Sequence, residues 1–206
     1  MKRDAFTLIE LIFSMVIIAI AFTVLPKMLQ LATKSSKQNL KEEGLYSAVA
    51  LMGLIQSTAW DERNTRYDDI LIVKNGHTAY NCSKITGYRI GGFTGSRNCK
   101  NEQNASTVLG PDADDNNIPD DMDDFTAYNA QNFNSSRAYK LTVSTRYVQD
   151  PAPAFSTTSS AQPTNTKYIT IDVNATSRQS VLGNNIARFY YFAENIGQMQ
   201  VNKRAW

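Results

Sequence analysis

The chain has 206 residues, 42% of them hydrophobic, and a formal net charge of +2. This length is enough for one domain of ordinary size with a buried core. Its 21 basic residues are scattered and nearly balanced by 19 acidic ones, which excludes the basic block typical of nucleic-acid-binding tracts. Nucleic acid is therefore not an expected partner.

The N-terminal segment predicts a membrane-spanning helix. A short leader, Met1–Ala5, precedes 20 almost wholly apolar residues, Phe6–Leu25. A helix of that length spans about 30 Å, the thickness of the hydrocarbon core of a bilayer. Because Lys2 and Arg3 come before the apolar residues, we expect the N-terminus to stay cytoplasmic and the rest of the chain to lie outside. Glu10 lies inside this segment, where an unpaired acid costs several kcal/mol.

Two simpler interpretations of this segment leave part of it unexplained. A secretory signal peptide requires a shorter apolar core and a small-residue cleavage site after it. Here the apolar residues end in Leu25-Pro26-Lys27, which is not such a site. An ordinary membrane anchor accounts for the length of the segment but gives no role to Glu10.

The string from Ala5 to Leu11, Ala-Phe-Thr-Leu-Ile-Glu-Leu, resembles the processing site of type IV pilins and pseudopilins. The resemblance implies that a prepilin peptidase cuts after Ala5 and N-methylates Phe6. It also implies that Glu10 pairs with the N-terminal amine of a neighbouring subunit during assembly, which supplies the cation that a buried carboxylate needs. The chain departs from the family pattern by having Ala5 where Gly is usual and by carrying an acid in its leader.

Apolar residues continue at helical spacing beyond Pro26 and as far as Ile55. A helix from Phe6 to about Ser57 is roughly 80 Å long, which is too long to be buried in a domain of this size. Its first half must therefore contact lipid or other subunits, while its amphipathic second half forms the spine of a domain. Pro26 predicts a kink at the membrane surface.

The remainder of the chain predicts an antiparallel sheet. Segments Arg137–Gln149 and Lys167–Asn174 alternate apolar and polar residues, and residues 150–166 between them are rich in Pro, Ser and Thr and predict a long hairpin loop. Further strands are expected at Asp69–Asn75, Thr78–Cys82, Tyr88–Thr94 and Ala187–Ala193. A sheet packed on the amphipathic helix predicts an α+β fold of the type IV pilin kind.

This organisation predicts three parts of the chain. Residues 1–5 are the prepilin leader, residues 6–26 are the transmembrane and assembly half of the helix, and residues 27–206 are an exported pilin-like domain. The exported domain comprises the amphipathic helix 27–58, the sheet and an acidic loop at residues 112–124.

The two cysteines, Cys82 and Cys99, are expected to form a disulfide, because an exported domain meets an oxidising compartment. Closing a loop of this size contributes about 3 kcal/mol in the chain-entropy model. Free thiols or half of a metal site are the alternatives. The absence of C-x-x-C spacing and the presence of a single histidine argue against a metal.

The acidic loop from Asp112 to Asp124 contains seven aspartates and predicts a calcium site. Oxygen-bearing side chains at loop positions 1, 3, 5, 9 and 12, with a main-chain carbonyl at position 7, follow the spacing of an EF-hand loop. The expected Ca²⁺ ligands are Asp112, Asp114, Asn116, Ile118 through its carbonyl, Asp120 and Asp123. Asn117 replaces the usual Gly of the turn, since Asn tolerates the left-handed conformation. The loop also resembles thrombospondin type 3 calcium repeats. Asp124 is an alternative twelfth ligand, and a solvated acidic loop without metal is the other interpretation.

No glycine-rich phosphate loop and no Ser/His/Asp or Cys/His set is recognisable, so we do not expect an enzyme. The favoured function is a minor pilin, a structural subunit of a bacterial type IV pilus-like filament. The alternatives are a pseudopilin of a type II secretion system and a membrane-anchored adhesin or binding module, whose binding surface would be formed by the loop 150–166 and the calcium-binding acidic loop. The expected partners are prepilin peptidase and other pilin or pseudopilin subunits. The expected location is the inner membrane, crossed once, before assembly and a periplasmic or extracellular filament afterwards.

Overall fold

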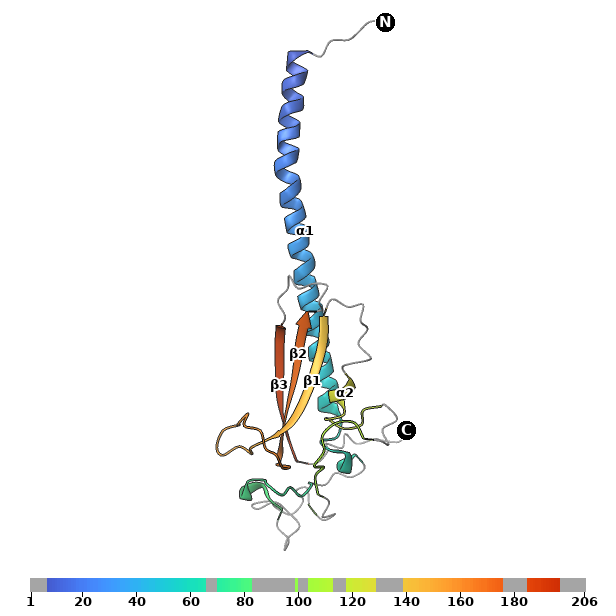
Figure 1. Cartoon of the computed structure of the whole chain (residues 1–206), viewed down its shortest axis with the longest axis vertical. Coiled ribbons are helices and arrows are strands. Elements are labelled where there is room, and N and C mark those ends of the chain that lie inside the picture. Colours follow the sequence, from blue (N-terminus) through green and yellow to red (C-terminus); the bar gives the residue numbers. More distant parts are fainter. Residues whose placement is uncertain are drawn as a thin grey trace, which may run out of the picture. The chain divides into compact units, whose positions relative to one another are not determined.

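The structure is a computed structural model that describes residues 7–65, 70–82, 99, 104–112, 118–128, 139–175 and 185–196. Its elements are α1 (Leu8–Ser57), the 3₁₀ helices η1 (Glu62–Asn64) and η2 (Thr78–Tyr80), α2 (Phe125–Tyr128), β1 (Tyr139–Val148), β2 (Thr166–Ala175) and β3 (Asn185–Glu194). Figure 1 shows these elements along the chain. The chain divides into two compact units, residues 1–43 and residues 44–206.

Helix α1 forms where the sequence predicts it. It contains Pro26 and continues through it as a single element. Pro26 has no backbone N–H to donate to the carbonyl of Phe22, so one hydrogen bond of the helical ladder is absent there. Just before this position, the Oγ1 atom of Thr23 donates to the carbonyl oxygens of Ala19 and Ile20, at 3.2 and 2.9 Å.

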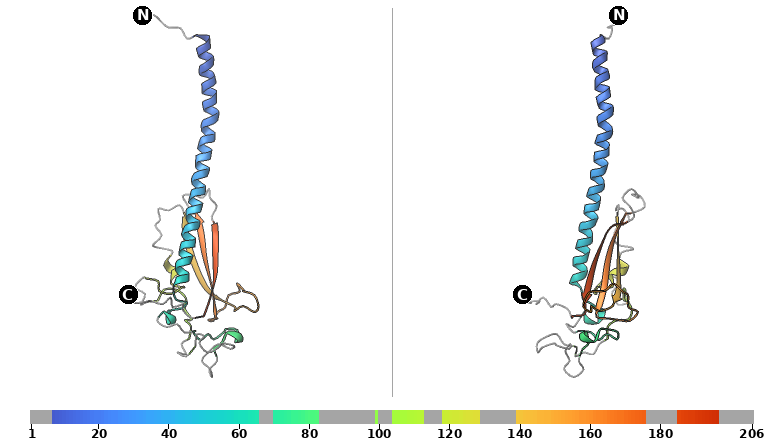
Figure 2. Two further views of the ribbon diagram at one scale, coloured as in Figure 1. Left: turned by 180° about the vertical axis from the view of Figure 1, so that it is seen from behind. Right: turned by 90° about the vertical axis from the view of Figure 1, so that its left-hand side faces the viewer.

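Within the second unit, α1 packs against the sheet through one face. Its buried residues recur at helical spacing and are Gly44, Ala48, Leu51, Met52 and Ile55. Except for Gly44, they form one hydrophobic core with strand residues such as Leu141 and Ile171, both fully buried. Figure 2 shows the strands lying along the C-terminal part of α1. The predicted α+β fold, with a long N-terminal helix packed on an antiparallel sheet, is confirmed.

Gly44 sets the distance between α1 and the sheet. A Cβ atom at this position would lie 3.0 Å from Cγ1 of Val173 and 3.4 Å from Cγ of Tyr139. The absence of a side chain therefore lets the helix approach these strands closely. Gly53 differs, because a Cβ atom there would meet nothing within 4 Å. Of these two glycines, only Gly44 serves close packing among the described residues.

The three strands form one antiparallel sheet in the order β1-β2-β3. In register, Val143 pairs with Ile171 and Ile171 pairs with Phe189, so alternate residues of all three strands face α1. These strands confirm the three later sequence predictions and the hairpin connection between the first two. The loop between β1 and β2 is itself folded back, since the N–H of Gln149 donates to the carbonyl of Thr158 at 3.1 Å.

The strand predicted at Thr78–Cys82 is wrong, because residues 78–80 form η2. The cause is local capping by His77, whose Nδ1 accepts from the N–H of Ala79 at 3.2 Å and whose carbonyl accepts from the N–H of Tyr80 at 2.9 Å. The strand predicted at Tyr88–Thr94 lies outside the described residues.

The apolar segment predicted as a strand at Asp69–Asn75 forms only an isolated bridge in its described part, between Ile72 and Asn104. The side chain of Asn195 takes the place of a second strand beside Leu71. The backbone N–H of Leu71 donates to Oδ1 of Asn195 at 3.0 Å, and the backbone carbonyl of Leu71 accepts from Nδ2 of Asn195 at 2.7 Å. The segment is buried as expected, but its hydrogen bonds do not extend the sheet.

Candidate functional site

The N-terminal part of α1 has the surface of a membrane-spanning helix. Its most apolar 18-residue window has a mean hydropathy of 2.7, and none of that window is buried. Large apolar side chains are exposed along it, including Leu8 at 79% and Phe22 at 75%. Among the described residues, α1 is the one helix long and apolar enough to cross a membrane. Removing apolar surface from water is favourable by about 25 cal/mol for each Å². A helix with this much exposed apolar surface therefore requires lipid or protein around it.

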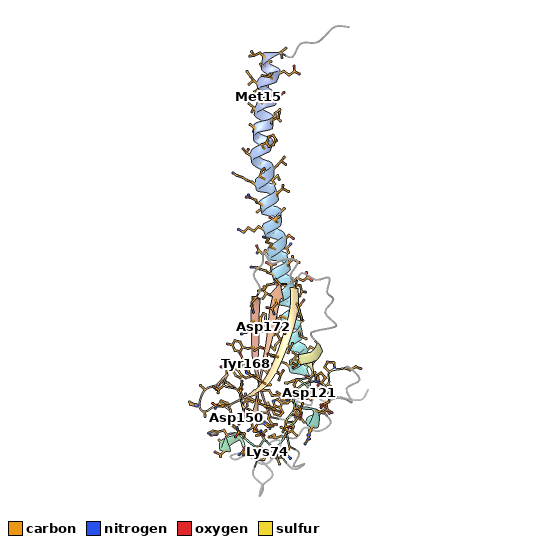
Figure 3. All side chains as sticks on the ribbon, viewed as in Figure 1. Met15, Lys74, Asp121, Asp150, Tyr168 and Asp172 are labelled. Atoms are coloured by element: carbon orange, nitrogen blue, oxygen red, sulfur yellow. A yellow bond between two sulfur atoms is a disulfide. The ribbon has the colours of Figure 1, made fainter. Side chains whose placement is uncertain are left out.

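Glu10 lies in the first turn of this helix and is exposed. Its N–H donates to the carbonyl of Thr7 at 3.1 Å, and its carbonyl accepts from Oγ of Ser14 at 2.8 Å. The backbone therefore places the Glu10 carboxylate on an apolar helix surface, with Met15 a little more than one turn further on (Figure 3). The processing residues Ala5 and Phe6 lie outside the described residues.

The predicted calcium ligands are only partly described. Asp112, Ile118 and Asp120 are exposed on either side of residues 113–117, with Ile118 at 69%. Asp114 and Asn116 lie outside the described residues. Within the described parts of the chain, no three His, Cys, Asp or Glu side chains are grouped so that they could hold a metal. The calcium site therefore stays a prediction.

The last three aspartates of the loop are buried and organise the turn that leads into α2. Oδ1 of Asp121 accepts from the N–H groups of Asp123 and Asp124, at 2.7 and 3.2 Å. Oδ2 of Asp124 accepts from the N–H groups of Asp120 and Asp121, at 3.0 and 3.1 Å. The N–H of Met122 donates to the carbonyl of Ala59 at 2.9 Å, so this turn is bound to the segment that follows α1.

The buried turn meets a fully buried lysine, Lys167, at the start of β2. The Nζ atom of Lys167 donates to Asp123 Oδ1, to the carbonyl of Trp60 at 2.6 Å and to Oδ2 of Asp61 at 3.5 Å. It also lies 4.5 Å from the centre of the Trp60 ring and 5.6 Å from that of Tyr147. We call Lys167, Asp61, Asp123, Trp60 and Tyr147 the lysine centre.

The lysine centre binds together segments that are distant in the sequence. Besides Lys167, Oδ2 of Asp61 accepts from the N–H of Ser106 at 3.0 Å and from the hydroxyl of Tyr147 at 3.4 Å. Oδ2 of Asp123 accepts from the N–H of Gly110 at 2.8 Å. One set of buried polar contacts thus joins four parts of the chain: residues 60–61 just after α1, residues 106–110, the turn at residues 121–124, and the sheet.

Burial and charge both shift pKa values in and beside the lysine centre. Burial by itself lowers the pKa of Lys167, but the charges of Asp123 and Asp61 outweigh it, so the pKa of the ammonium lies above its ordinary value. Burial raises the pKa of Asp121 to about 8, and the Asp123 charge adds to this effect while Lys167 opposes it. Lys167 therefore remains charged, as its carboxylate partners require.

The role of Lys167 was not predicted from the sequence, although a signal for it was present. Lys167 stands two residues before Ile169, which begins the alternating apolar row of β2 that faces α1. A lysine in phase with such a row must either lie at a sheet end or be buried against acids. The acids come from residue 61 and residue 123, a pairing that spacing along the chain does not indicate.

The two cysteines are joined in the structure. Cys82 and Cys99 form a disulfide with their Cα atoms 6.0 Å apart. The distance lies within the range usual for disulfides. The bond ties the segment after η2 to the chain that leads toward residue 104.

Comparison with known proteins identifies the N-terminal segment. Residues 1–26 match the family described as the prokaryotic N-terminal methylation motif. No curated protein and no solved structure matches the chain significantly. The motif, the apolar helix and the α+β fold support the type IV pilin and pseudopilin family and a pilin-like structural subunit. The motif implies processing by prepilin peptidase, membrane anchoring before assembly, and assembly with other pilin subunits.

Proposed function

We propose that this protein is a minor pilin, a structural subunit of a bacterial type IV pilus-like filament rather than an enzyme. The observation that carries the proposal is that the methylation motif at residues 1–26 continues into α1, whose C-terminal part is the spine of an α+β domain. One helix thus provides both the membrane segment and the core of the exported domain. The aspartate-rich sequence of residues 112–124 and the length of the chain favour a minor over a major subunit.

Processing exposes the groups that assembly needs. Cleavage after Ala5 leaves Phe6 as the N-terminus, and its methylated amine is a cation at membrane depth. The Glu10 carboxylate of a neighbouring subunit is the anion that this amine pairs with, and each group offsets the cost of placing the other in an apolar environment. The exposed apolar surface of α1 is covered by lipid before assembly and by other subunits afterwards.

A pseudopilin of a type II secretion system is the second candidate, because it has the same processing motif. The motif and the α+β arrangement fit both classes equally well. Genes beside this one distinguish them: a pilus ATPase and peptidase support the pilin, and secretion-channel genes support the pseudopilin.

Mass spectrometry of the mature chain tests the proposed processing. We expect the purified protein to begin at Phe6, with the mass of one added methyl group on its amine. The reason is that the residues after the leader match the motif of the peptidase. A host lacking prepilin peptidase should yield the chain with its leader intact, which is the control. A mature chain that still begins at Met1 in the native host contradicts the pilin function.

We also propose that the acidic loop binds calcium. Asp112 and Asp120 present exposed carboxylates at the two ends of residues 113–117, and Asp121, Asp123 and Asp124 are buried next to them. Asp121 has a raised pKa and Asp123 is paired with Lys167, so the repulsion that a divalent cation would relieve comes from the other acids of the loop. The ligands would be Asp112, Asp114, Asn116, the carbonyl of Ile118 and Asp120, with Asp123 or Asp124 completing the set. Calcium bound there would stabilise the folded state beside the lysine centre.

Calcium is expected to raise the melting temperature of the full-length protein in detergent by about 3 to 10 °C at roughly 10 mM, because it binds the folded state selectively. The measurement is thermal unfolding by circular dichroism in calcium and in chelator. Magnesium at the same concentration is the control ion, and the double variant Asp112→Ala and Asp114→Ala should lose the calcium effect. Equal melting temperatures with calcium and with chelator contradict the site.

A further inference from the structure

The sheet has a second face, which lies opposite α1 and carries a different set of side chains. In register, Arg146 pairs with Tyr168 and Tyr168 with Phe192, while Thr170 pairs with Tyr190. These residues alternate with the ones that face the core. We call this surface the outer face, and its residues are Thr142, Ser144, Arg146, Tyr168, Thr170, Asp172, Arg188, Tyr190 and Phe192, together with Phe155 of the loop between β1 and β2.

One half of the outer face is a group of aromatic rings. Phe192 lies 4.9 Å from Tyr168 and 6.2 Å from Tyr190, centre to centre. Phe155, from the loop between β1 and β2, stacks on Phe192 at 4.7 Å with 28° between the ring planes. Tyr190 is 64% exposed and Phe155 is 56% exposed, so two flat apolar surfaces are open to a ligand. The guanidinium of Arg146 covers the Tyr168 ring at 4.8 Å.

The other half of the outer face is polar and built from paired groups. Arg188 donates to both carboxylate oxygens of Asp172, from Nε at 2.6 Å and from Nη2 at 3.1 Å. The hydroxyl oxygens of Ser144 and Thr170 lie 2.7 Å apart and form a hydrogen bond. Figure 3 shows Asp172 and Tyr168 along the same strand. Donors and acceptors thus stand one or two residues from the exposed rings.

From this arrangement we infer that the outer face binds an uncharged polysaccharide chain. A sugar ring has an apolar face of C–H groups, which packs on an exposed aromatic ring, and a rim of hydroxyls, which bond to carboxylate, guanidinium and hydroxyl groups. Tyr190 and Phe155 supply the packing surfaces. Asp172, Arg188 and Ser144 supply the hydrogen-bonding groups beside them.

The charge of the outer face selects this ligand over a single-stranded nucleic acid, which also stacks on aromatic rings. Nucleic-acid binding requires a continuous cationic path for the phosphates. Here Asp172 places a carboxylate on the face, and the one arginine beside it, Arg188, is already paired with that carboxylate. Arg146 keeps its charge over the Tyr168 ring, so Arg146 and Arg188 against Asp172 leave these residues with a net charge of only +1 (2 − 1), too little for a phosphate path and suited to an uncharged ligand.

The test is binding of two uncharged probes, the β-1,4-linked hexamers of glucose and of N-acetylglucosamine, to the full chain in a detergent without a sugar headgroup. Saturation-transfer NMR detects contact and a titration gives the Kd. We expect at least one hexamer to bind, and Tyr190→Ala and Phe155→Ala each to weaken binding about tenfold. Tyr190→Phe, which keeps the ring, should bind within about threefold of the unchanged protein.

Tyr46→Ala is the matched control, because Tyr46 is 75% exposed but lies on α1. It should leave binding unchanged, and unfolding curves check that each variant is folded. The proposal is overturned if neither hexamer binds, or if Tyr190→Ala and Phe155→Ala bind as tightly as the unchanged chain. If no hexamer binds, two further measurements show what the face binds instead. Loss of binding to a 20-nucleotide single strand in the aromatic variants would assign the face to nucleic acid, and loss of self-association would assign it to a second copy of the chain; either result overturns the proposal.

Discussion

Lys167→Met is expected to destabilise the exported domain by about 3 to 5 kcal/mol, because it leaves buried carboxylates without their cation. The side chain of Lys167 is fully buried, and both Asp61 and Asp123 are within ion-pair distance of its Nζ. Met has nearly the same length, so the change removes the charge and the donor with little change in volume. The melting temperature should fall by about 6 to 20 °C.

Thermal unfolding of the full-length protein in chelator, followed by near-UV circular dichroism, measures this effect without a contribution from calcium. Lys140→Met is the matched control, since Lys140 is exposed on β1, and it should change stability by no more than about 0.5 kcal/mol. Adding Asp123→Asn to Lys167→Met should recover part of the loss, because it removes the charge that Lys167 neutralised. A melting temperature of Lys167→Met equal to that of the unchanged protein contradicts the role given to the lysine centre.

Glu10→Gln is expected to permit processing but to reduce incorporation into filaments by about tenfold or more. A neutral amide cannot neutralise the N-terminal amine of the neighbouring subunit, and loss of one partner of a buried charge pair costs about 2 to 5 kcal/mol. The measurement compares the amount of the variant in sheared filaments with the amount in the membrane. The mass of the membrane form reports whether cleavage after Ala5 still occurs.

Glu42→Gln is the control for this experiment. Glu42 is also an exposed glutamate of α1, but it lies beyond the apolar segment, where its carboxylate accepts from Nε2 of Gln38 at 3.2 Å. It should be incorporated normally. Normal incorporation of Glu10→Gln argues against a pairing role for Glu10 and leaves the processing motif itself unaffected.

The sequence by itself determined the parts of this protein that depend on local pattern. The apolar residues 6–25 and the helical spacing up to Ile55 predicted α1 almost to its ends. The alternation in residues 137–149 and 167–174 predicted β1 and β2, because a strand with one buried face requires that period. The methylation motif is likewise a contiguous string, so it can be recognised without a fold.

Only the tertiary structure decided which distant groups meet. It brought Lys167 together with Asp61 and Asp123, and these two aspartates lie 106 and 44 residues before Lys167 in the chain. It also placed Phe155 of a loop on Phe192 of β3, and it let the Asn195 side chain replace a strand beside Leu71. Charge pairing and ring stacking depend on distance in space, and residues separated by whole strands reach that distance only after the chain has packed. Periodicity reports which face of an element is buried, but not what is buried against it.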